Sequence, residues 1–154
     1  MTGNFDLDFA NTMILHHQEA IDMSEVEVAK GNDAQVKTMA QNIITAQKAE
    51  IAQMEQWVKD FKMPEAKKES GKMHNELTET MKAMMDKMKG MSMSGNTDKD
   101  FVMMMIPHHE SAVSMAEEEL EHGKNLPIKQ LAQKIIADQN KEIKDFQTWL
   151  NSHK

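Results

Sequence analysis

Apolar residues recur every three or four positions over most of the chain, which is the spacing of one face of an α-helix. The pattern predicts a first helix over residues 6–30, ended by Gly31, and a second helix that follows a turn at 32–33 and reaches about residue 61. The first inner face holds Phe9, Met13, Ile14, Ala20, Ile21, Met23 and Val28. The second holds Val36, Ala40, Ile43, Gln47, Glu50, Met54, Trp57 and Phe61.

Three more helices are expected, over about 65–89, 97–122 and 126–150. Thr97 is predicted to cap the fourth helix and Asn125 the fifth, because hydroxyl and amide oxygens accept hydrogen bonds from the free N–H groups of a helix start. With only 6 Gly and 3 Pro to interrupt these segments, the sequence predicts an all-α fold.

The sequence repeats itself after 92 positions, since residues 8–59 align with residues 100–151 without a gap. The matching pairs include Phe9 and Phe101, Met13 and Met105, His16 and His108, His17 and His109, Met23 and Met115, Glu27 and Glu119, Gln47 and Gln139, Glu50 and Glu142, and Trp57 and Trp149. A match of this length indicates a duplicated helical hairpin, and two such hairpins pack naturally as a four-helix bundle.

The expected organisation is therefore one all-α domain over residues 1–154. Its parts are repeat one (8–61), a Met-rich helical insert (64–95) and repeat two (98–151). An insert of this length provides a long crossover between the hairpins, which is the connectivity of ferritin-like four-helix bundles.

Composition excludes several classes of function. The net charge of -7 argues against nucleic acid, whose phosphates need clustered Lys and Arg, and no stretch is apolar for long enough to span a membrane. The absence of Cys removes disulfides and thiolate chemistry. Methionine is the outlier, with 17 residues against 5 Phe and 2 Trp, although cores normally use Met only as filler.

Two adjacent histidines follow a methionine in each repeat. Met13 lies three and four positions before His16 and His17, and Met105 stands in the same relation to His108 and His109, so each set shares a helix face. Thioether and imidazole together favour copper, as Cu(I), and the related ion Ag(I), while imidazole also accepts Cu(II). Two other interpretations stay open, namely zinc at the histidines alone and histidines that only hydrogen-bond at the edge of the core.

Six polar residues fall on the predicted inner faces, namely Glu27, Gln47, Glu50, Glu119, Gln139 and Glu142. A buried carboxylate needs a donor or a cation beside it. The imidazoles of the first and fourth helices are the obvious partners, so these six residues are expected to hydrogen-bond the histidines or to support metal ligands.

The insert and the start of the fourth helix carry further methionines, namely Met81, Met84, Met85, Met88, Met91, Met93, Met103 and Met104. One helix face cannot bury all of them, so some thioethers are expected at the surface. They serve either as additional soft-metal ligands or as an adaptable surface for another protein.

Two other functions remain as alternatives. A di-metal carboxylate enzyme needs a Glu-x-x-His motif in each half, and here Glu119-x-x-His122 is matched only by Glu27-x-x-Lys30. A copper-oxidising activity is compatible with mixed Met and His ligands. A Met-rich bundle that binds a partner protein, or itself as a homodimer, is the third possibility.

The motif Phe-x-x-x-Met-Ile-x-His-His-x-x-Ala-x-x-Met occupies residues 9–23 and returns at 101–115. With the later Gln-x-x-Glu-Ile and Trp elements, it resembles the CopM-like family of exported copper-binding proteins, formerly a domain of unknown function. The resemblance implies a ferritin-like bundle, a periplasmic or secreted location and binding of copper or silver without catalysis. The ligands that it implies are Met13, His16, His17, Met23, Met105, His108, His109 and Met115.

The sequence departs from that family in two respects. No signal peptide precedes the first predicted helix, so export is an expectation from the resemblance alone. Leu15 stands where the second copy of the motif has Pro107, so local helix geometry is expected to differ between the two copies.

Overall fold

The computed structural model describes residues 2–61 and 71–153, and all regular secondary structure in these ranges is α-helical. The helices are α1 (Phe5–Lys30), α2 (Ala34–Asp60), α3 (Gly71–Lys89), α4 (Thr97–His122) and α5 (Leu126–Ser152). The predicted all-α fold is confirmed. Residues 65–70, expected at the start of the third helix, lie outside the described residues.

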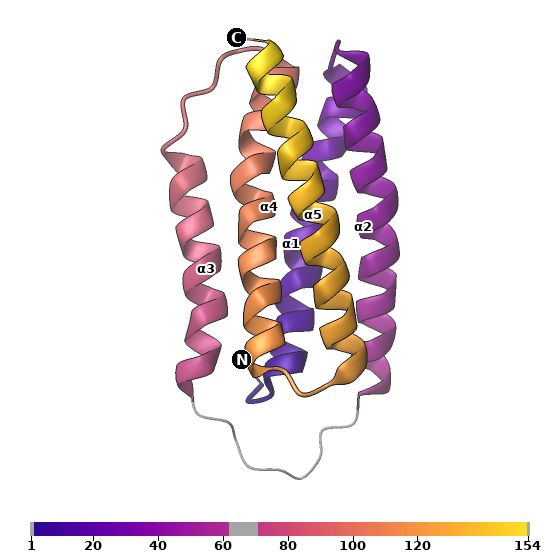
Figure 1. Cartoon of the computed structure of the whole chain (residues 1–154), viewed down its shortest axis with the longest axis vertical. Helices are drawn as coiled ribbons and strands as arrows, with labels where there is room; N and C mark the ends of the chain where they lie inside the picture. Colours follow the sequence, from indigo (N-terminus) through magenta and orange to yellow (C-terminus); the bar gives the residue numbers. More distant parts are fainter. Residues whose placement is uncertain (1, 62–70, 154) are drawn as a thin grey trace.

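Helices α1, α2, α4 and α5 form a four-helix bundle, and α3 lies along its outer side (Figure 1). The hairpin pairs α1–α2 and α4–α5 pack most extensively, and α1 packs against α4 between them. Helix α3 packs mainly on α4 and less on α1. No helix in the described part of the chain has an apolar stretch long enough to cross a membrane.

Helix ends largely follow the predicted signals. Asp33 caps α2 and Asn125 caps α5, each accepting a hydrogen bond from a backbone N–H three residues later. The prediction for α4 was wrong by one position. Thr97 is its first residue, and the cap is Asn96, whose side-chain oxygen accepts from the backbone N–H of Lys99 at 2.9 Å. The cause is local, because an amide oxygen caps at least as well as a hydroxyl.

Two aspartates form hydrogen bonds between the two hairpins. Asp98, at the start of α4, accepts hydrogen bonds from the backbone N–H groups of Asn32 and Asp33, just after α1. Asp6, 92 residues earlier, accepts from the backbone N–H groups of Lys124 and Asn125, just after α4. The start of each helix therefore lies beside the end of the other, and α1 and α4 run antiparallel.

Glycine is required at Gly31, the C-cap of α1, because a side chain there would collide with the last turn of the helix. A Cβ atom at this position would lie 2.0 Å from Oε1 of Glu27 and 2.7 Å from the Glu27 backbone oxygen. Gly123 stands in the same relation to Glu119, at 2.0 Å. Gly31 has a φ of -70°, which any residue can adopt, so close approach and not backbone freedom requires glycine.

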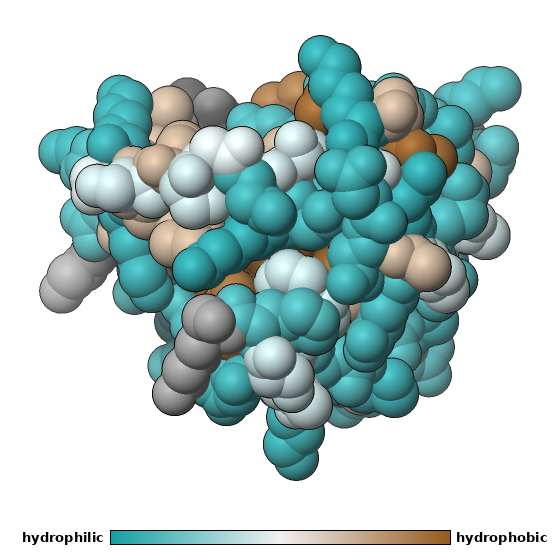
Figure 2. Space-filling view, turned by 90° about the horizontal axis from the view of Figure 1, so that it is seen from above, coloured by the Kyte–Doolittle hydropathy of each residue, from teal (hydrophilic) through white to brown (hydrophobic). Residues whose placement is uncertain are grey.

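Two large apolar clusters lie along the bundle, and a smaller one of Ile21, Ile44 and Ile51 joins α1 to α2. The first combines Phe9 of α1 with Ala112 and Ala116 of α4, and the second combines Ala20 of α1 with Val102 of α4. Seen from the end that carries the C-terminus, hydrophilic side chains cover most of the surface, and apolar groups are visible mainly between them (Figure 2). Between the two large clusters, the interior of the bundle contains polar side chains.

Candidate metal centre

His16 of α1 and His108 of α4 stack on each other between the two apolar clusters. Their ring centroids are 3.7 Å apart at an interplanar angle of 26°, and both residues are fully buried. They stand 92 positions apart, near the middle of two antiparallel helices, so the contact lies close to the axis that relates the hairpins. The predicted inward orientation of both residues is confirmed.

His17 and His109 extend this pair outwards on either side. Each lies 6.4 Å, between ring centroids, from its neighbour in sequence, and each is fully buried. We call the four rings the imidazole row, in the order His17, His16, His108, His109. It crosses the bundle from the α2 side to the α5 side.

The two inner rings have no hydrogen-bond partner at any nitrogen, since Nδ1 and Nε2 of both His16 and His108 are buried and unpaired. The nearest carboxylate oxygen with a recorded contact, Oε2 of Glu19, is 3.6 Å from Nε2 of His108, which is too far for a hydrogen bond. Buried polar groups are almost always paired, and an unpaired one costs about 1–3 kcal/mol. The four unpaired nitrogens are therefore available to bind a ligand.

Burial keeps the inner rings neutral. It lowers the pKa of His16 well below 6.5, and repulsion from a charge on His108, His17 or His109 lowers that pKa further. Burial also lowers the pKa of His108, although the Glu19 carboxylate partly opposes this. A neutral imidazole nitrogen carries a lone pair that is free to bind a metal ion, so the row is prepared for a metal at neutral pH.

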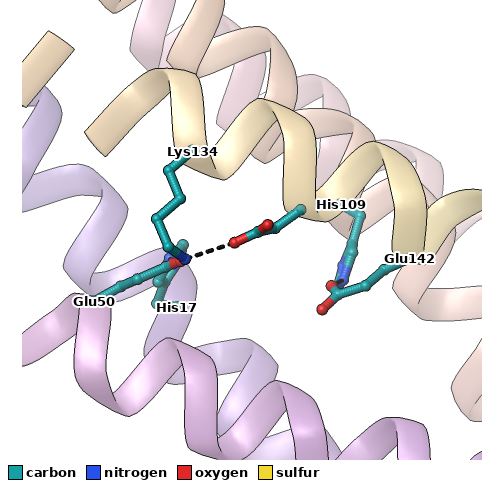
Figure 3. Close-up of polar contacts among 6 residues, drawn as sticks. His17, Glu50, His109, Lys134 and Glu142 are labelled. Carbon is teal, nitrogen blue, oxygen red and sulfur yellow. Dashed lines mark hydrogen bonds and ion pairs between the residues drawn. The ribbon is translucent and has the colours of Figure 1, made fainter. Parts of the chain in front are cut away.

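The outer rings are each held by a carboxylate, as Figure 3 shows. Nε2 of His17 lies 2.5 Å from Oε2 of Glu50, and Nε2 of His109 lies 2.5 Å from Oε2 of Glu142. The prediction that Glu50 and Glu142 meet imidazoles is confirmed. Nδ1 of each outer ring stays buried and unpaired. An imidazole with one nitrogen on a carboxylate and the other free is the usual arrangement of a metal-binding histidine.

The two outer pairs differ in one respect that sequence reasoning missed. Nζ of Lys134, on α5, lies 3.2 Å from Oε1 of Glu50 (Figure 3) and 2.6 Å from Oδ2 of Asp138. Burial alone would raise the pKa of Glu50, but its contacts with His17 and Lys134 together bring that pKa below 4.5. The available signal was a break in the repeat, because Asn42 stands 92 positions before Lys134.

The four methionines of the repeated motif form two groups, each with one residue from each repeat. Met13 of α1 and Met115 of α4 belong to the first apolar cluster, and both are fully buried. Met105 of α4 is fully buried in the second cluster, and Met23 of α1 packs against it half-buried. Because α1 and α4 are antiparallel, one thioether group lies on each side of the imidazole row along the bundle.

The other polar residues predicted to support the site lie in different places. Gln47 and Gln139 are buried, and Oε1 of each is unpaired. Glu27 lies beside Asp98 at one end of the α1–α4 pair. Glu119 lies close to Gly123 at the other end. The two glutamates are therefore far apart along the bundle.

The further methionines of the insert and of the start of α4 divide by exposure. Met84 is buried, Met85 and Met93 are 47% and 49% exposed, and Met81, Met88, Met91, Met103 and Met104 are intermediate. The expectation that some thioethers reach the surface is confirmed. Met81 packs against the first apolar cluster, which contains Met13 and Met115.

Side chains with oxygen or nitrogen ligands alone do not converge at a metal site. Within residues 2–61 and 71–153, no group of three or more His, Asp and Glu side chains has an arrangement that would hold a metal ion. Thioethers, which are donors of another kind, lie beside the imidazole row.

Fold and buried side chains together define a helical bundle with a Met- and His-lined interior. Residues 6–150 match the family described as Domain of unknown function (DUF305), and the chain belongs to that family. The resemblance inferred from the motifs is thereby confirmed. No curated protein matches the chain.

The solved structures that resemble the chain include several forms of CopM. CopM in the Ag-bound form, obtained by soaking, is 31% identical, with a TM-score of 0.73 over 96% of this chain and 95% of that one. The Cu(II)-bound form is also 31% identical, with a TM-score of 0.73 over 97% of each chain. The Cu(I)-bound form is 28% identical, with a TM-score of 0.72 over 96% of each chain.

A more distant relative shares the fold. A DUF305 protein from Streptomyces coelicolor, described as a candidate secreted protein, is 22% identical, with a TM-score of 0.76 over 99% of this chain and 95% of that one.

Proposed function

We propose that this chain binds copper ions in order to sequester or buffer them, as a copper-resistance protein and not as an enzyme. The preferred ion is Cu(I), and Ag(I) and Cu(II) also bind. The observation that carries the proposal is the buried pair of His16 and His108, whose four ring nitrogens are unpaired, between two groups of buried thioethers.

The chemistry of the donors supports a soft ion. Neutral thioether is a good ligand for Cu(I) and a poor one for hard cations such as Mg²⁺ and Ca²⁺, and imidazole accepts both oxidation states of copper. Met13 and Met115 on one side, and Met23 and Met105 on the other, supply the sulfur. His16 and His108 supply nitrogen to either side.

His17 and His109 complete the proposed ligand set through Nδ1. Their Nε2 atoms are held by Glu50 and Glu142, which fixes the rings and leaves the unpaired nitrogen for a metal ion. The relationship to CopM is independent support, since CopM has been solved with Ag, Cu(II) and Cu(I) bound at 28–31% identity to this chain.

The proposal extends to location. Export to the periplasm or the cell exterior follows from the resemblance to an exported family, and fractionation of cells that express the full-length gene tests it. Recovery of the protein with cytoplasmic markers would contradict this part of the proposal without affecting copper binding.

The direct test is anaerobic titration with Cu(I) against a competing chelator. The variants H16A/H108A and M13L/M115L are expected to lose most of the affinity of the wild-type chain. M54L is the matched control for the methionines, because Met54 is fully buried in the same cluster as Met13 but lies outside the repeated motif. Leucine keeps its volume and removes only the sulfur donor.

Two results would overturn the proposal. One is wild-type Cu(I) affinity in H16A/H108A with the helical content intact by circular dichroism. The other is an equal loss of affinity in M54L and M13L/M115L, which would mean that packing and not thioether ligation was disturbed.

A further inference from the structure

The two ends of the imidazole row are built from equivalent residues but have different electrostatic surroundings. At the His17 end, Glu50 contacts imidazole through Oε2 and the Lys134 ammonium through Oε1, at 3.2 Å. Asp138 holds the same ammonium at 2.6 Å, so the position of the Lys134 ammonium is fixed from two sides. A permanent positive charge therefore lies next to the carboxylate that supports His17.

At the His109 end no ammonium takes that place. The residues 92 positions before Lys134 and Asp138 are Asn42 and Ala46, both shorter and uncharged. A cavity of about 220 Å³ lies there between α2 and α5, and its lining includes Asn42, Ala46 and Glu142. The Glu142 side chain is 26% exposed, against 7% for Glu50.

Lys141 also lines that cavity and interacts electrostatically with Glu142, but its Nζ is paired with Oδ2 of Asp145 at 2.9 Å. Among the described residues, no ammonium is recorded in hydrogen-bonding contact with the Glu142 carboxylate, whereas Lys134 contacts Glu50 directly. A metal ion at His17 is therefore repelled more strongly, by Lys134, than a metal ion at His109 is by Lys141.

We propose that Lys134 makes the two ends of the row unequal, so that the His109–Glu142 end takes up a metal ion first and holds it more tightly, and the His17–Glu50 end is filled second. Lys134 is a positioning residue that touches no metal and acts through Glu50. The inference rests on the proposed copper-binding function, because Lys134 can make the two ends unequal only if both His17 and His109 bind metal ions.

The experiment follows both ends separately. The full chain, with ¹⁵N-labelled histidine, is titrated with Ag(I), which does not change oxidation state, while the side-chain resonances of His17 and His109 are observed. In the wild type the His109 resonances are expected to shift first, with stepwise affinities of the order of tenfold apart, the size expected for one extra unit charge nearby.

Exchanging Lys134 and Asn42 between the two ends tests whether the charge of Lys134 causes the order of binding. K134N gives the first end the residue of the second, and the two histidines are expected to shift together. N42K gives the second end an ammonium, and His109 is expected to lose its priority. K134R keeps the charge and should keep the wild-type order. K48N removes a surface lysine that pairs with Glu25 at 3.7 Å, and it should also leave the order unchanged.

The outcomes separate this inference from the function on which it rests. No shift at any imidazole, with Ag(I) in excess, overturns the copper-binding proposal and this inference with it. Shifts that occur in the reverse order, or an order that K134N leaves unchanged, overturn only the role of Lys134. Loss of the order in K48N as well would assign it to overall charge and not to the contact with Glu50.

Discussion

The Glu27 carboxyl group on α1 lies beside the Asp98 carboxylate on α4, and the two groups shift each other's pKa in opposite directions. Burial, and then the interaction with Asp98, raise the pKa of Glu27 from 4.5 to about 8. Burial would also raise the pKa of Asp98, but its interaction with Glu27 and its hydrogen bonds from the backbone N–H groups of Asn32 and Asp33 bring that pKa below 3.8. A Glu27 carboxyl group with this pKa keeps its proton at neutral pH and is a donor available to the Asp98 carboxylate, between α1 and α4.

The pair predicts that the bundle loses stability as the pH rises. A carboxyl group whose folded pKa lies above its unfolded value of 4.5 stabilises fully below pH 4.5, and this contribution is lost as the pH passes through about 8. The loss is at most about 1.4 kcal/mol per pH unit for one proton. Glu27→Gln keeps a neutral donor and should remove the slope.

The measurement is urea unfolding between pH 7.5 and 9. This window lies above the ordinary histidine pKa of about 6.5, so His16 and His108, whose pKa is lowered in the folded chain, are largely neutral in both the folded and the unfolded chain. Glu25→Gln is the matched control on the exposed face of the same helix. A wild-type slope that survives in E27Q would contradict the assignment to Glu27.

A second prediction concerns Gly31, which lies against Glu27. Ala at this position brings a Cβ to within 2.0 Å of the carboxylate, so G31A is expected to lower the free energy of unfolding by about 1–3 kcal/mol, as overpacking does. The backbone already has an ordinary φ of -70°, so Ala would be harmless without the contact.

The double variant G31A/E27A identifies the cause. Removing the carboxylate should recover part of the loss, and the Glu27 backbone oxygen at 2.7 Å accounts for the remainder. If thermal unfolding shows that the two single losses simply add, Gly31 is required for some reason other than the side chain of Glu27.

The features that depend on the spacing of residues along one helix could be predicted from the sequence. Helical periodicity located the helices, and the repeat directed His16 and His108 inwards. The same patterns placed Glu50 on the face that meets an imidazole, which the contact with His17 bears out. These results follow from which residues share a helix face, and that is a property of the chain itself.

The remaining features depend on how helices meet, and periodicity does not encode this. That Met13 shares a cluster with Met115 and not with Met105 follows from the antiparallel packing of α1 and α4. Glu27 was expected beside the histidines because it shares their face, but α1 is long enough to carry it to the end of the bundle. Lys134 was overlooked because it stands at a position where the two repeats differ, opposite Asn42.

A third prediction separates exposed from buried thioethers. Met85 and Met93 are about half exposed, whereas Met13, Met105 and Met115 are fully buried. Mild peroxide should therefore oxidise the first two before the other three, because sulfoxide formation follows access. Ag(I) affinity should stay unchanged while only Met85 and Met93 carry sulfoxide, and should fall once the buried residues are oxidised. Peptide mapping by mass spectrometry gives the order, and an early fall in affinity would make the exposed thioethers the ligands.

The imidazole row also predicts that the residues needed for metal binding lower the free energy of unfolding of the metal-free chain. His16 and His108 bury four unpaired nitrogens, and replacing both with leucine removes these unpaired polar atoms and extends the apolar packing. H16L/H108L is therefore expected to raise the free energy of unfolding of the metal-free chain by about 1–3 kcal/mol while it abolishes Cu(I) retention.

His122 provides the contrast for that prediction. Its Nε2 is paired with Oε2 of Glu76 at 2.9 Å, so His122→Leu removes a satisfied contact and should not stabilise the chain. H16L/H108L adds two leucines and His122→Leu adds one, but each histidine-to-leucine exchange changes helix propensity by only about 0.5 kcal/mol, so a gain of about 1–3 kcal/mol reports mainly the unpaired nitrogens. Thermal unfolding in the presence of a chelator makes the comparison. A metal-free H16L/H108L chain that is less stable than the wild type would mean that the stacked imidazoles hold the bundle together, and their unpaired nitrogens would no longer argue for a bound ion.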